Sequence, residues 1–416
     1  MPVTDLKSTL SPLNSAMPRP LPHKPATAPP PASHKSLKKL WLQLHLYLGL
    51  FGGALFVLTS LTGSALVFYK TIDEWLNPDQ VIRTVGTDQP LTDIVAGART
   101  AHPDWSPPDT LIFPLHDRDS FHAWFKDPAA APAEERWHVV AVDPSTARPL
   151  SDRRWGSFFV SFIYELHQEL LLGRSGEIVV GVMAVLLLAS IGTGLYLWWP
   201  APGKLRRALT FQPGNSIVRR HYDLHKLTGL GGAIVLTLLA LTGFYLEFPQ
   251  VVTEVVSWVS PVRNMSPDEH PQSEFQAGAP KIPLEQAIAI ARATFPDARP
   301  MWVGLPQDER DSYSVGLRQP GEVRQAGGQT EVWIDQYSGS VRRVTDWRRF
   351  TGGETFLAWL FPLHNGEAFG LAGRWIVFVT GLTPLILYGT ALRMWWLKRI
   401  AHQRRRARPE RTSQSL

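Results

Sequence analysis

The sequence contains no cysteine in 416 residues, and this absence limits the chemistry open to the protein. A chain without cysteine forms no disulfide, carries no covalently attached c-type haem and holds no cysteine-ligated iron–sulfur cluster. Several catalytic motifs are also missing. The sequence has no Gly-x-Ser-x-Gly and no glycine-rich phosphate loop before a helix. His167 is followed by Gln-Glu-Leu, without the second His of a zinc-protease helix.

Formal charge is missing from four apolar stretches that are 18 to 24 residues long. They are Leu46–Tyr69, Ile178–Trp199, Leu227–Leu246 and Trp375–Leu392. Helices of this length cross about 30 Å of hydrocarbon. Arg374 and Arg393, which flank the shortest stretch, can extend their charged groups to the membrane surface. We therefore expect an α-helical membrane protein with four transmembrane helices in a lipid bilayer.

Basic residues gather in short segments beside these stretches: in the first 40 residues, in the loop after the second span and in the tail after the fourth. The positive-inside rule predicts that both termini and that loop are cytoplasmic. These flanks also account for the pI near 9.5, so we expect no nucleic-acid partner. The leader, rich in Pro, Ala and Ser, is expected to be disordered. The first span is too long for the apolar region of a signal peptide, so we expect it to remain as an uncleaved anchor.

The predicted organisation has nine segments. In chain order they are a disordered cytoplasmic leader (1–35), the first transmembrane helix (36–70), an external domain (71–155), an external-side helix with the second transmembrane helix (156–200), a cytoplasmic loop (201–218), the third transmembrane helix (219–248), a second external domain (249–350), an external-side helix with the fourth transmembrane helix (351–398) and a basic cytoplasmic tail (399–416).

The membrane segments repeat along the chain. An offset of 180 residues relates the first span to the third: His45, Gly49 and the Leu-Thr-Gly at 61–63 recur as His225, Gly229 and the Leu-Thr-Gly at 241–243. An offset of 197 residues relates the second span to the fourth: His167, Gly173 and Gly176 recur as His364, Gly370 and Gly373. We therefore expect two parallel, pseudo-symmetric repeats with two His each.

Each external segment has the pattern of one helix followed by short strands. Helical periodicity over 91–102 stops at Pro103, and the same pattern over 284–295 stops at Pro296. Strand-like runs follow at 110–115, 121–126 and 137–142, and again at 300–305, 312–317 and 331–334. Each unit is predicted to be a helix against a small antiparallel sheet.

These units and spans resemble a known family. A helix, strands and a hairpin of the Val-Asp-x-x-Ser/Thr-Gly type are similar to the PepSY domain, although Asp143-Pro-Ser-Thr-Ala in the first unit lacks the usual Gly. Such units between spans with these His and Gly motifs resemble the PepSY-associated transmembrane family, over roughly residues 36–400. The motifs that carry the resemblance are Leu44-His45…Gly49…Leu61-Thr62-Gly63, Leu166-His167…Gly173, Gly192 to Pro200, and Leu224-His225…Thr242-Gly243.

The family includes iron-regulated proteins of the bacterial inner (cell) membrane, among them siderophore-iron reductases. The resemblance therefore implies a multi-pass inner-membrane protein with two small α+β PepSY-like domains in the periplasm. It also implies a function in the reduction of iron bound to siderophores.

Five of the thirteen His flank or enter membrane segments: His45, His167, His221, His225 and His364. An ionisable side chain there is costly and indicates a functional site. With a pseudo-two-fold axis along the membrane normal, His45 would face His225 near the cytoplasmic side, and His167 would face His364 near the external side. Two facing neutral imidazoles suit bis-His ligation of haem b, so we expect two haems. Gly49 and Gly229, one turn beyond a His, would leave room for the macrocycle.

Other interpretations stay open. These His can also cap helix ends while the Gly residues mediate helix packing. His221 shares a helix face with His225. The matching position in the first span is Trp41, so His221 has no symmetric counterpart, and we keep it as a candidate for the haem edge or for proton handling. Arg174 and Arg374 are candidates for binding haem propionates or an anionic chelate, or else anchor the topology. The remaining His, including those at 102 and 138, lack ligand spacing and are interpreted as structural or exposed.

The resulting hypothesis is a cytochrome b that passes electrons across the membrane to a periplasmic ferric siderophore and so releases Fe(II). The cytoplasmic segments are too short for a flavin or nicotinamide domain, so the donor is expected to be another cytoplasmic protein or a quinol. The alternative is a haem-free, non-enzymatic membrane scaffold whose PepSY domains bind or restrain periplasmic partners.

Overall fold

The computed structural model describes residues 34–82, 86–130, 136–212, 216–263, 270–275 and 277–406. The predicted disordered leader falls almost wholly outside these residues, and so does the end of the basic tail. Among the described residues, four helices are long and apolar enough to cross a membrane: Leu37–Leu66, Arg174–Trp198, Ile217–Glu247 and Glu367–Arg404. The four predicted spans are confirmed, and the protein is a multi-pass membrane protein.

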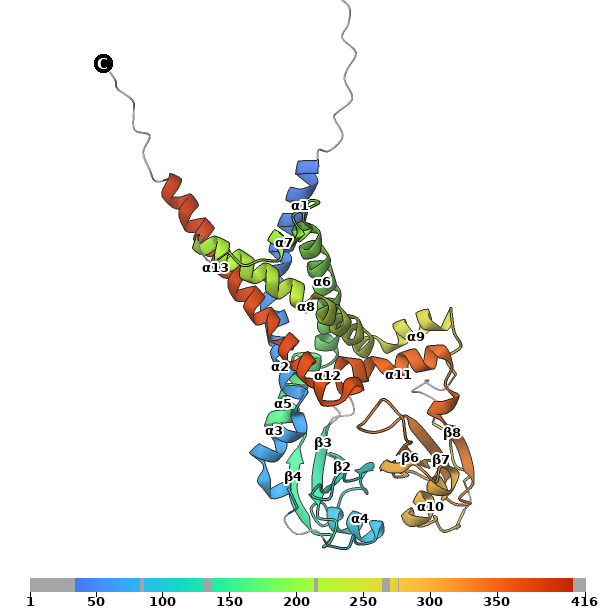
Figure 1. Ribbon diagram of the computed structural model, residues 1–416. Helices are drawn as coiled ribbons and strands as arrows, with labels where there is room; N and C mark the ends of the chain where they lie inside the picture. Colours follow the sequence, from blue (N-terminus) through green and yellow to red (C-terminus); the bar gives the residue numbers. More distant parts are fainter. Residues whose placement is uncertain are drawn as a thin grey trace, which may run out of the picture.

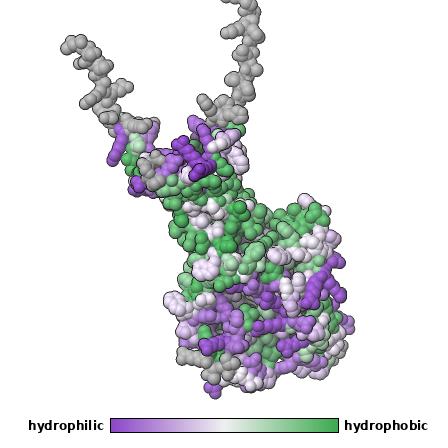
Figure 2. Space-filling model, in the orientation of Figure 1, coloured by the Kyte–Doolittle hydropathy of each residue, from purple (hydrophilic) through white to green (hydrophobic). Residues whose placement is uncertain are grey.

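The spans form a closed bundle. The first span consists of α1 (His34–Tyr47), a short π-helical turn η1 (Leu48–Gly52) and α2 (Gly53–Leu66). It contacts α6 (Arg174–Trp198) on one side and α13 (Thr383–Arg406) on the other, and α8 (Ile217–Glu247) packs against both of these helices. Figure 2 shows a hydrophobic band around this part of the molecule, between polar surfaces at its two ends. Large apolar side chains exposed over such a band are suited to contact with lipid.

The fourth span is interrupted. α12 (Gly370–Gly381) ends at Gly381, Leu382 caps it, and α13 begins at Thr383. Pro384 is the second residue of α13. Proline has no backbone N–H to donate. In the first turn of a helix this N–H has no partner within the helix, but in the interior it would bond the carbonyl four residues earlier. The break therefore lies where the sequence permits a new helix to start.

Two helices connect the spans to the extramembrane part of the chain. α5 (Phe159–Glu169) packs on α2, and α11 (Gly352–His364) packs on α8. α11 starts with a capping box in which Thr351 and Glu354 each accept a hydrogen bond from the other's backbone N–H. α5 ends at Leu170, whose φ of 51° turns the chain sharply before α6.

Shorter elements complete the helical part. They are α3 (Tyr69–Leu76), η2 (Pro78–Gln80), α7 (Leu205–Ala208), α9 (Pro249–Ser257), η3 (Trp347–Arg349) and η4 (Glu367–Phe369).

The extramembrane part contains one antiparallel sheet of eight strands in the order β4-β3-β2-β1-β5-β6-β7-β8. The strands are β1 (Thr110–Ile112), β2 (Phe121–Lys126), β3 (Trp137–Val142), β4 (Pro149–Arg154), β5 (Arg299–Gly304), β6 (Ser312–Arg318), β7 (Thr330–Asp335) and β8 (Val341–Thr345). The first four come from the segment between the first and second spans, and the last four come from the segment between the third and fourth spans. β1 pairs with β5, with Leu111 opposite Val303, and this pairing joins the two sets.

The two segments between spans also share one core. Helices α4 (Leu91–Arg99) and α10 (Leu284–Thr294) contact each other, and one cluster of buried side chains includes Ile94 and Leu111 with Ile288 and Val332. Two separate domains were predicted from the sequence, whereas the strands of these segments form a single sheet. Pairing β1 with β5 explains the difference, because it removes two open strand edges.

Six strands lie close to their predicted positions, but the sequence analysis does not predict β4 and β8. Their sequences, Pro-Leu-Ser-Asp-Arg-Arg and Val-Arg-Arg-Val-Thr, are polar, and most of their residues are exposed or half-buried. They are the two edge strands, where charged side chains are common and hydrophobic alternation is weak. In Figure 1 the sheet lies at one end of the bundle, and the described ends of α1 and α13 lie at the other.

Candidate functional site

Four of the five membrane-associated His form two pairs. His45 on α1 and His225 on α8 have ring centroids 6.2 Å apart, with ring planes at 90°. His167 on α5 and His364 on α11 also have ring centroids 6.2 Å apart, with planes at 49°. We call His45 and His225 the span pair, because both lie on transmembrane helices. We call His167 and His364 the sheet-side pair, because α5 and α11 lie between the bundle and the sheet (Figure 1).

Each of the four rings is held in the same way by a neighbouring helix. Its Nδ1 contacts the hydroxyl of a threonine at 2.9–3.2 Å, and in three of the four rings it also contacts the backbone carbonyl three residues before that threonine. The partners are Ser190 and Thr193 for His45, Leu387 and Thr390 for His225, Thr59 and Thr62 for His167, and Thr242 for His364.

These contacts fix which ring nitrogen carries the proton. A carbonyl oxygen only accepts hydrogen bonds, so Nδ1 must be the N–H donor. The threonine hydroxyls do not compete, since each donates to a carbonyl of its own helix and offers a lone pair to the imidazole. Nε2 therefore keeps its lone pair in all four residues, and this is the form in which His binds a metal.

Burial keeps the sheet-side pair neutral. It lowers the pKa of His167, and it lowers that of His364 to about 4, with the neighbouring His167 acting in the same direction. At pH 7 both rings are therefore uncharged and keep the lone pair that a ligand requires.

The spacing of the rings fits ligation of one metal by two imidazoles. An imidazole nitrogen bound at about 2 Å on each side of a metal places the two ring centroids about 6 Å apart. Both pairs have this separation. Haem b is held by such axial ligands and needs no cysteine, so the residues present fit this group at both places.

Small residues give the rings room. A Cβ added to Gly63 would lie 2.7 Å from Cε1 of His167, and one added to Gly243 would lie 3.3 Å from Cε1 of His364. A Cβ on Gly194 would lie 3.1 Å from Cε1 of His45. Each of these glycines directly follows a threonine that contacts the same His. The fourth threonine is followed by Ala391, so the span pair tolerates a methyl group there.

Gly49 and Gly229, predicted to leave room for a macrocycle, differ from each other. A Cβ on Gly49 would meet no atom within 4 Å, whereas one on Gly229 would make an ordinary contact with Leu387 at 3.4 Å. Gly49 also lies in the π-helical turn η1 that follows His45. Such turns occur frequently at functional sites.

The other predicted candidates lie apart from the pairs. Nδ1 of His221 contacts only the Ile217 carbonyl of its own helix, at 2.8 Å, among the contacts of the described chain. The guanidinium of Arg174 is largely exposed and pairs with Glu177 at 2.5 Å. Arg374 lies 3.9 Å from the buried carboxylate of Glu367. None of these contacts reaches one of the four paired rings.

The four threonines had no role predicted from the sequence. Thr62 and Thr242 lie in the repeated Leu-Thr-Gly motif, and Thr193 lies in the stretch from Gly192 to Pro200. Their function depends on which helices are neighbours, because each threonine lies more than 100 residues from the His it contacts. The threonine itself recurs at both offsets, at positions 62 and 242 and at positions 193 and 390, and this recurrence was the one signal that pointed to these residues.

The family of the chain follows from a comparison with sequence models. The model of the PepSY-associated TM region matches residues 42–398. The chain belongs to this family. The matched region of this PepSY-associated TM protein contains both His pairs, all four threonines and the whole sheet. No curated protein matches the chain.

Proposed function

We propose that this protein is a haem b protein of the bacterial inner membrane that passes electrons across the bilayer to reduce a periplasmic ferric siderophore and release Fe(II). The observation that carries the proposal is the shared geometry of the two pairs. In each, the centroids of two imidazoles lie 6.2 Å apart, and all four Nδ1–H groups are already used by a threonine hydroxyl, three of them also by a backbone carbonyl. A helix-capping role would not require this fixed tautomer in four separate places.

The residues of the chain have separate parts in this function. The span pair would hold one haem and the sheet-side pair a second one. When bound, haem supplies reversible one-electron chemistry at its iron. The carbonyls and threonines hold the proton on Nδ1, orient the rings and increase the basicity of Nε2. The surrounding apolar helices exclude water from the span pair.

Orientation determines where the reaction ends. The basic loop after α6 and the basic tail support a cytoplasmic location for that end of the bundle. The sheet and the sheet-side pair then lie toward the periplasm, and a bulky polar iron chelate reaches that side without crossing hydrocarbon. The electron donor is a cytoplasmic protein or a quinol. Reporter fusions at Gln212 and Asp308 test this orientation: the first should be cytoplasmic and the second exported.

The central experiment measures electron delivery. Purified protein is first examined for a reduced-minus-oxidised spectrum of b type. The reduced protein is then mixed in a stopped-flow instrument with a ferric hydroxamate siderophore and a ferrous chelator. We expect reoxidation to be faster than in buffer alone, with Fe(II) appearing in step with it.

A variant of the sheet-side pair provides the decisive comparison. His364→Ala should leave the span pair reducible but stall Fe(II) formation, while His221→Ala should behave as the unchanged protein. Fe(II) formation at the original rate in His364→Ala would show that the sheet-side pair does not deliver electrons. Absence of any b-type spectrum would instead favour a haem-free scaffold.

A further inference from the structure

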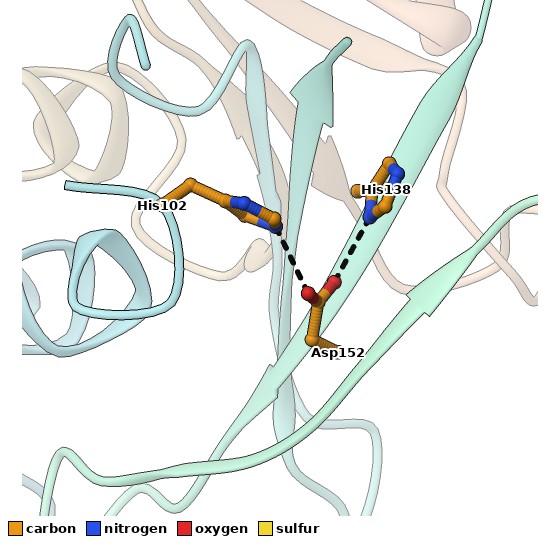
Figure 3. Close-up of side chains that lie close together, drawn as sticks. All are labelled: His102, His138 and Asp152. Atoms are coloured by element: carbon orange, nitrogen blue, oxygen red, sulfur yellow. Dashed lines mark hydrogen bonds and ion pairs between the residues drawn. The ribbon is translucent and has the colours of Figure 1, made fainter. Parts of the chain in front are cut away.

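His102 and His138, which show no ligand spacing in the sequence, lie close together at the sheet with an aspartate. Figure 3 shows His102, His138 and Asp152, with the carboxylate of Asp152 between the two rings. His138 Nδ1 lies 3.1 Å from Oδ1 of Asp152, and His102 Nε2 lies 3.1 Å from Oδ2. The three donor atoms all lie within 4.8 Å of one another.

The fold brings these residues to one place. His138 is on β3 and Asp152 on the adjacent edge strand β4, where Asp152 is paired with Val140. Residues 138, 140 and 152 therefore share one face of the sheet. This is the face on which the core lies, because Val140 belongs to the buried cluster together with Ile94 of α4. His102 lies in the turn after α4 and approaches the same face.

Aromatic side chains pack against both imidazoles. The ring of Trp105 stacks on that of His102 with centroids 3.7 Å apart and planes at 11°. The same Trp105 ring meets the edge of His138 at 5.1 Å. Phe125 contacts His102 from a third side at 5.6 Å. The side chains of His102 and His138 are only 11 and 19 % exposed, whereas Asp152 is 35 % exposed and leaves the cluster open on one side.

One ring nitrogen in this cluster, Nε2 of His102, has no hydrogen-bond partner among the described residues. His138 Nδ1 forms a hydrogen bond with Asp152. His102 Nε2 lies as close to the carboxylate, but its direction does not satisfy a hydrogen bond, and this buried atom has no other hydrogen-bond partner among the described residues. A buried imidazole nitrogen of this kind needs either a proton acceptor or a metal.

We propose that His102, His138 and Asp152 form a binding site for a divalent first-row transition metal. Bonds of about 2.0–2.2 Å to imidazole nitrogen and carboxylate oxygen place two donors of a tetrahedral ion about 3.4 Å apart. Both His–Asp distances of 3.1 Å are close to this value, so small side-chain shifts complete the geometry. Two imidazoles and one carboxylate select Zn²⁺, Co²⁺ or Fe²⁺ over Mg²⁺ and Ca²⁺, which take oxygen ligands. The open side at Asp152 leaves a coordination position for water.

This site is independent of the proposed haem function. It lies on the sheet, and its residues belong to neither His pair. The competing explanation is a hydrogen-bonded cluster in which Asp152 only joins two imidazoles. The two explanations differ in whether the cluster takes up a metal and in whether that uptake depends on all three side chains.

The test uses the full-length protein in detergent after removal of adventitious metal. Isothermal titration with Zn²⁺ counts the sites, and Co²⁺ provides a visible absorption spectrum that reports nitrogen and oxygen ligands. Asp152→Asn keeps the shape of the side chain and should remove one site. The affinity loss should be at least the roughly 10–100-fold that results from losing an outer-shell partner. His138→Ala should give the same result.

A matched control is available in the same segment. His116 also lies beside an aspartate, with Nδ1 3.3 Å from Oδ2 of Asp119, but the His116 side chain is exposed, and among the described residues this pair does not belong to a group of three possible metal ligands. His116→Ala should keep the full number of sites. Zn²⁺ should also raise the melting temperature of the unchanged protein but not of Asp152→Asn.

Two results would overturn the proposal. One is an unchanged number of sites and affinity in Asp152→Asn. The other is binding of Mg²⁺ as tightly as Zn²⁺. His102→Ala removes the stacking on Trp105 and can destabilise the sheet, so Asp152→Asn, checked by circular dichroism, decides the result.

Discussion

His45 and His225 lie on transmembrane helices, whereas His167 and His364 lie on α5 and α11, the helices that join the sheet to the bundle. Each ring is nevertheless held by a threonine hydroxyl of a neighbouring helix, and three of the four rings also contact a backbone carbonyl of that helix. Ring separation is 6.2 Å in both pairs, while the angle between ring planes is 90° in one and 49° in the other. The pairs therefore share how each ring is fixed and differ in how the two rings face each other.

The difference has a structural origin. The angle within the span pair depends only on the packing of the transmembrane helices. The angle within the sheet-side pair also depends on α5 and α11, which follow the edge strands β4 and β8 closely in the chain. Thr62 lies 17 residues after His45, or about 25 Å along a helix, so the two pairs are well separated. A local change should therefore affect one pair and leave the other intact.

Removing one imidazole should have the largest effect. On the proposed function, His45→Ala should lose the haem assigned to the span pair, and His364→Ala should lose the one assigned to the sheet-side pair, because an axial ligand is absent in each case. Each variant should retain about half of the haem per protein, measured by pyridine haemochrome absorbance. His221→Ala is the control and should keep both haems. Full haem content in His45→Ala would remove the distinction between the two pairs.

Adding one methyl group beside His167 should have a larger effect than adding one beside His364. Gly63→Ala places a Cβ 2.7 Å from the ring of His167, which is held by two contacts and cannot move freely. We expect a loss of stability of about 1–3 kcal/mol and weaker haem binding. Gly243→Ala meets the ring of His364 only at 3.3 Å and should cost much less. Thermal unfolding of both variants gives the order, and equal effects would contradict these contacts.

The spans, the paired His and the residues around them differ in how far they could be predicted from the sequence. The four spans and the four paired His were predictable, because apolar length and repeated spacing are local properties of the chain. The roles of Thr62 and Gly63 were not predictable, since they depend on α5 packing against α2. The same holds for His102 and His138, which are 36 positions apart and meet only because β3 and the turn after α4 lie on one face of the sheet.

In the sheet, too, local patterns were predictable and contacts between distant segments were not. Strands with hydrophobic alternation were predicted, and the polar edge strands β4 and β8 were not. The pairing of β1 with β5 could not be predicted either. It joins residues almost 200 positions apart, and the pattern of each unit is equally compatible with a separate four-stranded sheet.

Removing one hydroxyl should produce a smaller change that is restricted to one pair. Thr242→Val removes the hydroxyl that lies 2.9 Å from Nδ1 of His364. We expect both haems to be retained, with the affinity at the sheet-side pair reduced about tenfold and its midpoint potential shifted. Thr237→Val is the matched control, since the Thr237 hydroxyl bonds only Ala233 of its own helix. Redox titration should show an unchanged span pair in both variants, and a shift of the span pair in Thr242→Val would break the comparison.

The smallest effect is expected where the two halves of the sheet meet. The carboxylate of Glu285 on α10 accepts hydrogen bonds from the N–H and the hydroxyl of Thr92 on α4, both at 2.7 Å. Burial acts to raise the pKa of Glu285, but these hydrogen bonds outweigh it and hold the pKa below its ordinary value of 4.5. A folded-state pKa below the unfolded one stabilises the protein above about pH 4.5, and this contribution disappears as the pH falls through the folded value.

Glu285→Gln should therefore lower the free energy of unfolding of the sheet by about 1 kcal/mol at pH 7, the size of one exposed hydrogen bond. The difference from the unchanged protein should shrink as the pH falls below 4.5, because the protonated carboxyl and the amide then bind Thr92 similarly. Urea unfolding followed by tryptophan fluorescence at pH 7 and at pH 3.5 measures both values. A difference that stays constant between them would show that the carboxylate charge is not what joins α4 to α10. The spectrum of the haem proposed for the span pair should not change in this variant, because the hydrogen-bond partners of His45 and His225 lie on the transmembrane helices α6 and α13.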